Sequence, residues 1–493
     1  MDYLIMKAAG KYVRNYCFLA VITFFCMCAL VFANFDANNA VKNAQKSKVP
    51  VKNTLKSKAT KVNQKTNNGK SAASTSHVTK QKIEVEKKTK TQPKQLKRKK
   101  TFKKKQPVRF VPIEKIIDQE KNVIGNAASL GAFFNSLQKI EKKGEGKVNI
   151  LHIGDSHIQS GVLAKVVRQK LQKVFGNAGR GLICPYALAR TNGPRDYTIA
   201  SDATWTQESV IHKEKSLNIG ICGLTILSDA HGADLTITLN SRDAVNNKFN
   251  KISVFHENRL LNTDLVFLDT NGGKMAGVVN RRLEQGCCNY VSSAELAEYR
   301  DGLKIQALPK EGDADFTQIN GIILESGNPG ILYHNVGING ATYQDYNEEA
   351  FIRQVAYLEP ELIIISLGTN ESFARNFHPD EFIGHVDILI SGLKKHLSRA
   401  AFILTVPPDS LKGRSKNWNV PVIRRELLSY CQKNNLAYWD LFSVMGGLGS
   451  MRTWQANKLA SPDSVHFLTS GYELQGKLLF DALIKSYDQY ATH

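Results

Sequence analysis

The sequence predicts an α/β fold with a five-stranded parallel sheet covered by helices on both faces. The first of three observations supports this fold, and the other two distinguish further segments from it. Five short apolar runs are each followed by a stretch with apolar residues at helical spacing. Residues 197–328, which lie between the first and second of these runs, show alternating strand patterns without convincing helices. Residues 36–107 are rich in lysine and nearly lack aromatic residues, which predicts a disordered tether ahead of the fold.

Charge is concentrated near the amino terminus. The 493-residue chain has a formal net charge of +22. Residues 40–106 hold 21 Lys, one Arg and two Glu, so they carry +20, and residues 107–493 carry only +1. The expected folded part is therefore almost neutral. The charge of the whole chain does not by itself indicate a nucleic-acid-binding domain.

The first 35 residues predict a membrane anchor or a signal segment. A short basic stretch precedes residues 16–33, an uncharged apolar run. A run of about 18 residues lies between a long signal-peptide core and a short membrane span. We favour an uncleaved anchor in the inner membrane with the rest of the chain exported to the periplasm. If the fair cleavage site at residues 31–33 is used, the protein is secreted instead. Long downstream domains are translocated largely regardless of charge.

Residues 36–107 are expected to act as a flexible, self-repelling tether. Its lysines would attract an anionic envelope polymer or anionic lipid headgroups, or the segment is only a solvated spacer that sets reach. Nucleic acid is disfavoured as a partner, because no aromatic residues interleave with the lysines as in single-strand binders. Export would also remove the chain from nucleic acid.

The expected hydrolase core is divided into residues 108–196 and 329–493. Its predicted strands are 148–154, 331–336, 362–367, 402–406 and 437–442, and its predicted helices are 161–175, 343–358, 379–397, 420–434 and 470–490. Alternating β and α units predict a parallel sheet with helices on both faces. Ligands of such sheets bind beyond the carboxyl ends of the strands.

Residues 197–328 are expected to form an inserted antiparallel β-sandwich. Strand patterns occur at residues 234–239, 252–255, 265–268, 303–307 and 319–324, with turn residues at 271–273, 301–302 and 311–313. Such an insert would lie between the first two strands of the parallel sheet. It could provide the long surface that a polysaccharide substrate needs.

The cysteines do not form a recognisable framework. The expected exported part holds five, an odd number without metal-site spacing, so at most two disulfides could form: Cys184, Cys222, Cys287, Cys288 and Cys431. No metal or cofactor is expected.

Two distant segments supply the groups of a serine-hydrolase triad. Ser156 follows the first apolar run within Gly154-Asp155-Ser156-His157, and Asp463 and His466 lie three residues apart before the last helical stretch. A serine attacks an ester at neutral pH only when a histidine takes its proton and a carboxylate orients that histidine. The pattern predicts a serine esterase.

Acyl transfer also needs hydrogen-bond donors aimed at the developing oxyanion. Gly340 lies in a Gly-Ile-Asn-Gly-Ala stretch after the second predicted strand, and Asn370 lies in Gly-Thr-Asn-Glu after the third. The backbone N–H groups of Ser156 and Gly340 and the amide of Asn370 are the expected oxyanion hole.

With these four blocks in order, the chain resembles the SGNH, or GDSL-type, hydrolases. The four named family residues correspond to Ser156, Gly340, Asn370 and His466. Asp463 occupies the position of the family's aspartate, three residues before the histidine. The resemblance implies a three-layer α/β/α fold. It is nearest to bacterial peptidoglycan O-acetylesterases, which carry a carbohydrate-binding-like β-sandwich between the first two blocks. His157 and Glu371 depart from residues usual in the family.

Three functions remain open from the sequence. The first is an esterase that removes O-acetyl groups from peptidoglycan or another envelope polysaccharide through an acetyl-serine intermediate. The second is an O-acetyltransferase with the same nucleophile and oxyanion hole. The third is a non-enzymatic wall-binding protein that uses the sandwich and the tether, against which the intact triad argues.

Overall fold

The structure, a computed structural model, describes residues 115–492 apart from 241–246, 258–262, 270–272, 274–276, 284–288 and 310–315. The expected anchor and tether lie outside the described residues, as do Cys287 and Cys288 and most of the predicted turns at 271–273 and 311–313. None of the helices within the described part is both long enough and apolar enough to cross a membrane.

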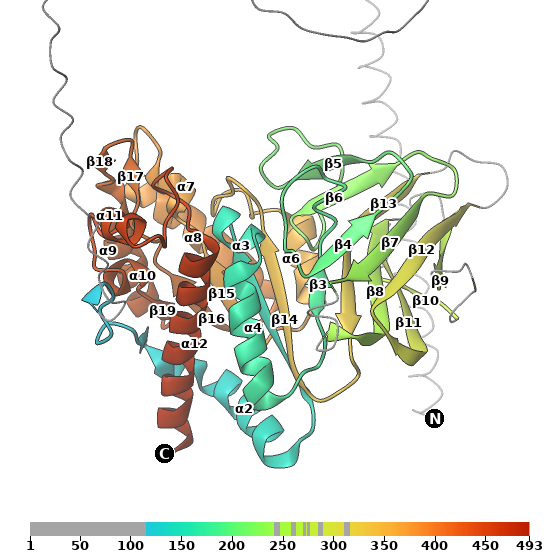
Figure 1. The fold of residues 1–493 in the computed structure, drawn as a ribbon, viewed down its shortest axis with the longest axis horizontal. Coiled ribbons are helices and arrows are strands. Elements are labelled where there is room, and N and C mark those ends of the chain that lie inside the picture. The colour runs from blue at the N-terminus through green and yellow to red at the C-terminus, as the bar shows by residue number, and fades with distance from the viewer. Residues whose placement is uncertain are drawn as a thin grey trace, which may run out of the picture. The chain divides into compact units, whose positions relative to one another are not determined.

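A mostly parallel sheet forms the centre of the fold (Figure 1). Five parallel strands match the five predicted ones, and the α/β fold class is confirmed. In spatial order the sheet contains β1 (Ile124–Gly125), β19 (Ala437–Trp439), β16 (Ala401–Thr405), β15 (Leu362–Ser366), β2 (Lys147–Gly154) and β14 (Gly330–Gly337). The sequence did not predict β1, a two-residue antiparallel edge strand, because so short a segment has no readable period.

The pairing register places three strand ends together. Gly154 of β2 lies opposite Gly337 of β14 and Ser366 of β15. The chain leaves all three strands at the same edge, so the loops that follow them converge there. These loops hold Ser156, Gly340 and Asn370.

Helices cover both faces of this sheet, as expected for three layers. Helices α2, α4 and α12 pack against Val148 and Ile150 of β2, and α6, α8 and α9 pack on the side of Leu151 and Ile153. Their bounds are α2 (Gly131–Lys143), α4 (Val162–Phe175), α6 (Glu349–Ala356), α8 (Pro379–His396), α9 (Asn419–Lys433) and α12 (Thr469–Ala491), with short segments η2 (Ala127–Leu130), α3 (Ser156–Gln159), α7 (Thr369–Ser372), α10 (Leu441–Val444) and α11 (Met451–Ala456).

One helix begins later than predicted. The sequence indicated a helix over 343–358, but α6 begins at Glu349. Asp345 instead accepts hydrogen bonds at 2.8 and 2.6 Å from the N–H and the hydroxyl of Thr342. These bonds close a turn, which competes with helix formation at these residues.

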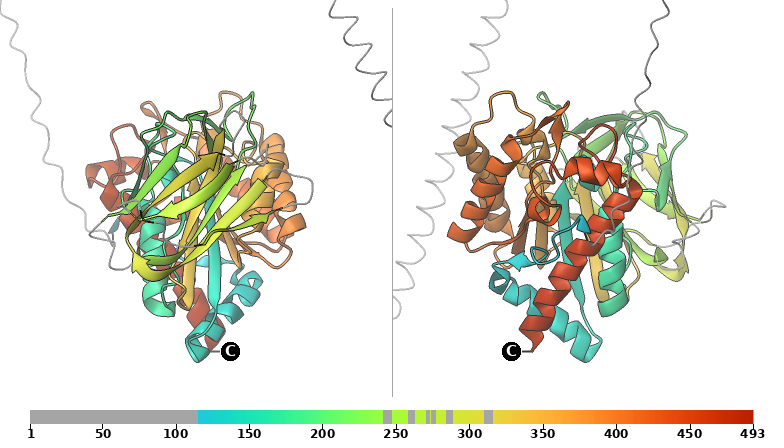
Figure 2. Two further views of the ribbon diagram at one scale, coloured as in Figure 1. Left: turned by 90° about the vertical axis from the view of Figure 1, so that its right-hand side faces the viewer. Right: turned by 60° about the vertical axis from the view of Figure 1, so that its left-hand side comes forward.

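Two antiparallel sheets lie between β2 and β14 in the chain and form a sandwich beside the core (Figures 1 and 2). One contains β10 (Val279–Arg282), β11 (Asn289–Arg300), β8 (Phe249–Glu257), β13 (Thr317–Glu325), β6 (Leu224–Ser228) and β5 (Thr206–Ser209), with β3 (Gly181–Ile183) beside β13. The other contains β4 (Tyr197–Ala200), β7 (Asp234–Leu239), β12 (Gly302–Pro309) and β9 (Thr263–Leu268). A small hairpin, β17 (Leu411–Lys412) and β18 (Ser415–Lys416), lies elsewhere.

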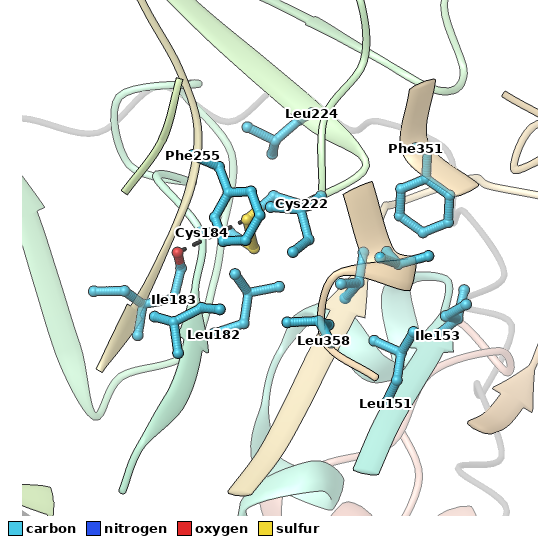
Figure 3. Packing of buried hydrophobic residues seen from close by; sticks show 14 of the residues in the cluster. Leu151, Ile153, Leu182, Ile183, Cys184, Cys222, Leu224, Phe255, Phe351 and Leu358 are labelled. Carbon is cyan, nitrogen blue, oxygen red and sulfur yellow. Dashed lines mark hydrogen bonds between the residues drawn. A yellow bond between two sulfur atoms is a disulfide. The ribbon is translucent and has the colours of Figure 1, made fainter. Parts of the chain in front are cut away.

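The sandwich and the core share buried surface. One continuous apolar cluster runs from Leu151 and Ile153 of β2 to Leu224 and Phe255 of the sandwich (Figure 3). A disulfide between Cys184 and Cys222 lies within this cluster. The boundaries at 197 and 328 stay predictions. Strand β3 joins the sandwich sheet from residues ahead of 197.

Candidate active site

Ser156 lies at the first turn after β2. Asp155 is the N-cap of α3, and its carboxylate accepts the N–H of His157 at 2.9 Å. A Cβ at Gly154 would lie 2.3 Å from Cγ1 of Ile158 and 2.9 Å from the carbonyl oxygen of Ser366. Only glycine therefore lets the strand turn this tightly into α3, and this turn places Ser156 at the carboxyl edge of the sheet.

Ser156 is joined to His466 and Asp463 by hydrogen bonds. Oγ of Ser156 lies 2.8 Å from Nε2 of His466, and Nδ1 of His466 lies 2.9 Å from Oδ2 of Asp463. The other oxygen of Asp463 accepts the N–H groups of Val465 and His466, both at 2.9 Å. Partial burial opposes ionisation of Asp463, but these backbone bonds and His466 hold its pKa below its usual value. A carboxylate at Asp463 favours the tautomer of His466 with its proton on Nδ1, which leaves Nε2 able to accept from Ser156.

Gly340 and Asn370 belong to the neighbouring loops. Gly340 has a φ of 83°, and a Cβ there would meet nothing within 4 Å, so conformation and not space favours glycine. Nδ2 of Asn370 donates to the carbonyl oxygen of Ala341 at 2.9 Å and lies 3.4 Å from Oδ2 of Asp155. The structure thus brings together the segments of all five predicted site residues. Their catalytic roles are considered under the proposed function.

Comparisons with known proteins match part of the sequence and the fold. The model of the GDSL-like lipase/acylhydrolase family matches residues 318–474, which include Gly340, Asn370, Asp463 and His466. A solved structure of a peptidoglycan O-acetylesterase in action superposes with a TM-score of 0.63 at 22% identity, covering 74% of this chain and 98% of the other. The chain has the SGNH hydrolase fold. The similarity indicated by the four sequence blocks is confirmed.

Other solved structures match a smaller part of the chain. A putative acylhydrolase from Bacteroides fragilis is 22% identical and covers 31% of this chain and 76% of its own, with a TM-score of 0.26. A catalytic mutant of an acetylxylan esterase from Geobacillus stearothermophilus is 18% identical, covers 32% and 73%, and has a TM-score of 0.25. No curated protein matches this chain by sequence. The family match, together with the assembled site, supports an esterase.

Two carboxyl groups with raised pKa values lie next to the candidate site. Burial raises the pKa of Asp155 to about 7, although the N–H of His157 and the nearby His466 oppose this shift. Burial also raises the pKa of Glu371 to about 7, opposed by the N–H of Tyr343, which donates to Glu371 at 2.8 Å. The negative charge of Asp155 raises the pKa of Glu371 further. Ionisation of Asp155 therefore disfavours ionisation of Glu371.

Two histidines, His157 of α3 and His152 of β2, lie close to the site. Nδ1 of His157 lies 3.0 Å from the hydroxyl of Tyr472, and its ring centroid lies 5.3 Å from that of His466. The two ring nitrogens of His152 lie 2.7 Å from the hydroxyls of Tyr333 and Ser366. Burial lowers the pKa of both histidines to about 3, so both are neutral at physiological pH. Within the described residues, no group of three or more His, Cys, Asp and Glu side chains could hold a metal ion.

A polar network beside Gly340 was not found from the sequence. Gln159 accepts the N–H of Asn339, and its amide donates to the carbonyl oxygen of Asn192 at 2.6 Å and to Thr191 at 2.9 Å. The side chain of Asn339 donates to Asn192 at 2.7 Å. The available signals were the position of Gln159 three residues after Ser156 and that of Asn339 directly before Gly340. The network holds the Gly340 loop against α3.

A groove of about 630 Å³, which we call the α4–α12 groove, runs along the surface next to the site. Its walls come from the first turns of α4 and α12 and from residues 192–196. Phe467, which follows His466, and Ser160, which ends α3, both line it. No local sequence pattern predicts this groove, because its walls are far apart along the chain.

Proposed function

We propose that this chain is a serine esterase that removes O-acetyl groups from a cell-envelope polysaccharide, peptidoglycan above all. The observation that carries the proposal is the hydrogen-bonded series from Ser156 through His466 to Asp463, at 2.8 and 2.9 Å. It lies at the edge of a parallel sheet where ligands of such folds bind. Peptidoglycan as substrate is supported by the fold shared with a peptidoglycan O-acetylesterase.

In the proposed first step, Nε2 of His466 takes the proton of Ser156 while Oγ attacks the acetyl carbonyl carbon. The C=O electron pair moves to the carbonyl oxygen. When the tetrahedral intermediate collapses, the sugar oxygen leaves with the proton from His466, and Ser156 carries the acetyl group. Asp463 keeps the imidazole oriented and stabilises its positive charge. Water then attacks the acetyl-serine by the same route and releases acetate.

The oxyanion would be bound by the backbone N–H groups of Ser156 and Gly340 and by the amide of Asn370. The strong bond of Asn370 to Ala341 fixes its side chain, whereas its contact with Asp155 is long at 3.4 Å. The second N–H of this amide is therefore the one available to an oxyanion. Donors fixed before the reaction stabilise developing charge without a cost of reorganisation.

An exported location is also part of the proposal. The disulfide between Cys184 and Cys222 supports it, because such bonds persist in oxidising compartments such as the periplasm. An anchor at residues 16–33 and binding of the lysine-rich tether to anionic envelope polymers or lipid headgroups remain proposals from the sequence.

The test is release of acetate from O-acetylated peptidoglycan, measured beside acetylated xylan and a medium-chain p-nitrophenyl ester. We expect the peptidoglycan to be the best substrate and Ser156→Ala to lower its turnover by about 10³-fold or more. Near-normal activity of Ser156→Ala would exclude the serine mechanism. Transfer of acetyl groups to a chitooligosaccharide without acetate release would indicate the transferase instead.

A further inference from the structure

A small cavity lies where the sandwich meets the loops of the proposed active site. Its volume is about 110 Å³. One wall comes from β5 and the residues that follow it, among them Ile211 and His212, and another comes from Gln159 and residues 338–339 of the core. Gln159 lies three residues after Ser156, and Asn339 directly precedes Gly340. The cavity is therefore next to the loop that carries one of the proposed oxyanion donors.

Part of the cavity lining is apolar and buried. Ala189, Leu224 and Ile338 line the cavity and are at most 6% exposed. Ile211, which is 39% exposed, adds an aliphatic side chain nearer the solvent. Such a lining favours a ligand group that has an apolar part, because burial removes that part from water.

Two polar atoms of the lining remain available to a ligand. Nδ2 of Asn339 donates to Asn192 at 2.7 Å and to Thr191 at 3.3 Å, which fixes the side chain, and no described residue donates to its Oδ1. Nδ1 of His212 accepts the N–H of Ser209 at 3.2 Å. This bond selects the tautomer with the proton on Nε2, which has no acceptor in the part of the chain that the structure describes. The walls thus offer one acceptor and one donor.

The size and charge of the cavity narrow its ligand further. Pockets that hold a whole small molecule measure about 300–1,000 Å³. A cavity of about 110 Å³ has room for one substituent of a larger substrate. Among the described residues that line it, none is Asp, Glu, Lys or Arg. An unpaired charge is costly to bury, so the substituent that fits is neutral.

We propose that this cavity binds the acetamido group of an N-acetylated amino sugar in the substrate. The group is neutral, and its methyl suits the apolar lining. Its carbonyl oxygen can accept from Nε2 of His212, and its N–H can donate to Oδ1 of Asn339. This inference rests on the proposed function and narrows its substrate to O-acetylated glycans of N-acetylated amino sugars. An amide of an attached peptide offers the same polar groups, and probes without peptide separate these two sources.

Two neutral oligosaccharides with the same linkage test the proposal on the full chain. Chitotetraose carries an acetamido group at C2 of every sugar, whereas cellotetraose carries a hydroxyl there. Both are randomly O-acetylated to the same degree, and acetate release is measured as kcat/KM. We expect a value about tenfold higher for the chitotetraose, the effect of about one hydrogen bond with burial of the methyl. Calorimetry with the two oligosaccharides before O-acetylation measures binding in the same way without any reaction.

Variants at the cavity locate this preference. Ile211→Trp places a larger side chain in the lining and should bring the ratio of the two oligosaccharides close to one. Val279→Trp is the matched control, because it adds the same side chain at a 69% exposed aliphatic position on β10, at the opposite edge of the sheet from β5. It should leave the ratio unchanged. His212→Asn keeps an acceptor for the N–H of Ser209 but removes Nε2, and it should lower the ratio about threefold. General damage lowers both activities and leaves their ratio unchanged.

The outcomes separate this inference from the proposed esterase. Equal kcat/KM values for the two oligosaccharides with the unaltered protein, or a preference that persists in Ile211→Trp, overturn the acetamido site even though acetate is released. Tighter binding of chitotetraose that is lost in Ile211→Trp supports the site. If that binding occurs without acetate release from either oligosaccharide, the esterase is overturned and the site is supported.

Discussion

The carboxylate of Glu371 accepts a hydrogen bond of 2.8 Å from the backbone N–H of Tyr343, across two loops that follow different strands. The bond from Asn370 to the carbonyl oxygen of Ala341 joins the same two loops. Gly340 and Asn370, the proposed oxyanion donors, lie in these loops. Their relative position therefore depends on two hydrogen bonds and not on packing alone.

Loss of the Glu371 acceptor should destabilise the protein. Glu371→Ala leaves a buried N–H of Tyr343 without a partner, which costs about 1–3 kcal/mol. Glu371→Gln keeps an oxygen at this position and should cost much less. Unfolding in urea measures both. Equal losses in the two variants would mean that the charge of Glu371, and not its acceptor, holds the loops.

Asn370→Ala should lower turnover by roughly 10²–10³-fold and change KM little, because an oxyanion donor acts mainly in the transition state. Steady-state kinetics with p-nitrophenyl acetate check this. A change confined to KM would show that Asn370 only positions the substrate.

Local sequence patterns predicted most of the core. They did not predict contacts between residues that are far apart in the sequence. The strand run ending at Gly154 and the motifs around Ser156 and His466 are local, so they can be read directly. The network of Gln159, Asn192 and Asn339 cannot, because each side chain becomes informative only when folding brings the others near. Polar partners far apart in sequence carry no period. For the same reason the sequence does not predict the α4–α12 groove or the hydrogen bond between Glu371 and Tyr343.

Stability should fall as the pH drops below 6.5. Burial lowers the pKa of His256 to about 4 and those of His152, His157 and His334 to about 3. Each therefore stays neutral in the fold at pH values where the unfolded chain binds a proton. Their contribution is full above pH 6.5 and is lost as the pH falls toward 4 for His256 and toward 3 for the other three. The raised pKa values of Asp155 and Glu371, and the smaller rises at Glu361 and Asp409, act in the opposite sense and reduce the slope of stability against pH.

His256 offers a direct check, because it lies in the sandwich, where its Nε2 contacts the hydroxyl of Ser292 at 2.7 Å. His256→Gln should reduce the slope of the unfolding free energy against pH by about one proton, or about 1.4 kcal/mol per pH unit, between pH 4.5 and 6. Denaturant titrations across this range measure the slope. An unchanged slope would refute neutral burial of His256.

Residues at the edge of the sandwich nearest the site are expected to affect activity on polymeric substrates more than activity on small esters. Ile211, which is 39% exposed, lines a cavity of about 110 Å³ together with Gln159 and Asn339. Ile211→Ser should lower acetate release from peptidoglycan more than hydrolysis of p-nitrophenyl acetate, since remote contacts are used only by the larger substrate. Val279→Ser, on β10 at the opposite edge of the sheet, is the control. A parallel fall of both activities would contradict this role.

The tether should serve localisation and not catalysis. A shortened chain beginning at Val108 should hydrolyse small esters as well as the whole chain, because residues 107–493 carry only +1. Its sedimentation with wall sacculi should be weaker at low salt, and the difference should shrink at high salt through screening. Equal sedimentation at low salt would leave the tether a spacer.

Ser156 and its partner His466 are separated by 310 positions in the chain, with the entire sandwich between them. During synthesis, the serine therefore emerges long before the base that would activate it. A product truncated anywhere ahead of His466 has an unactivated hydroxyl at Ser156. Under the proposed mechanism, incomplete chains have no base to activate Ser156, and esterase activity first becomes possible when the final helix packs against α4.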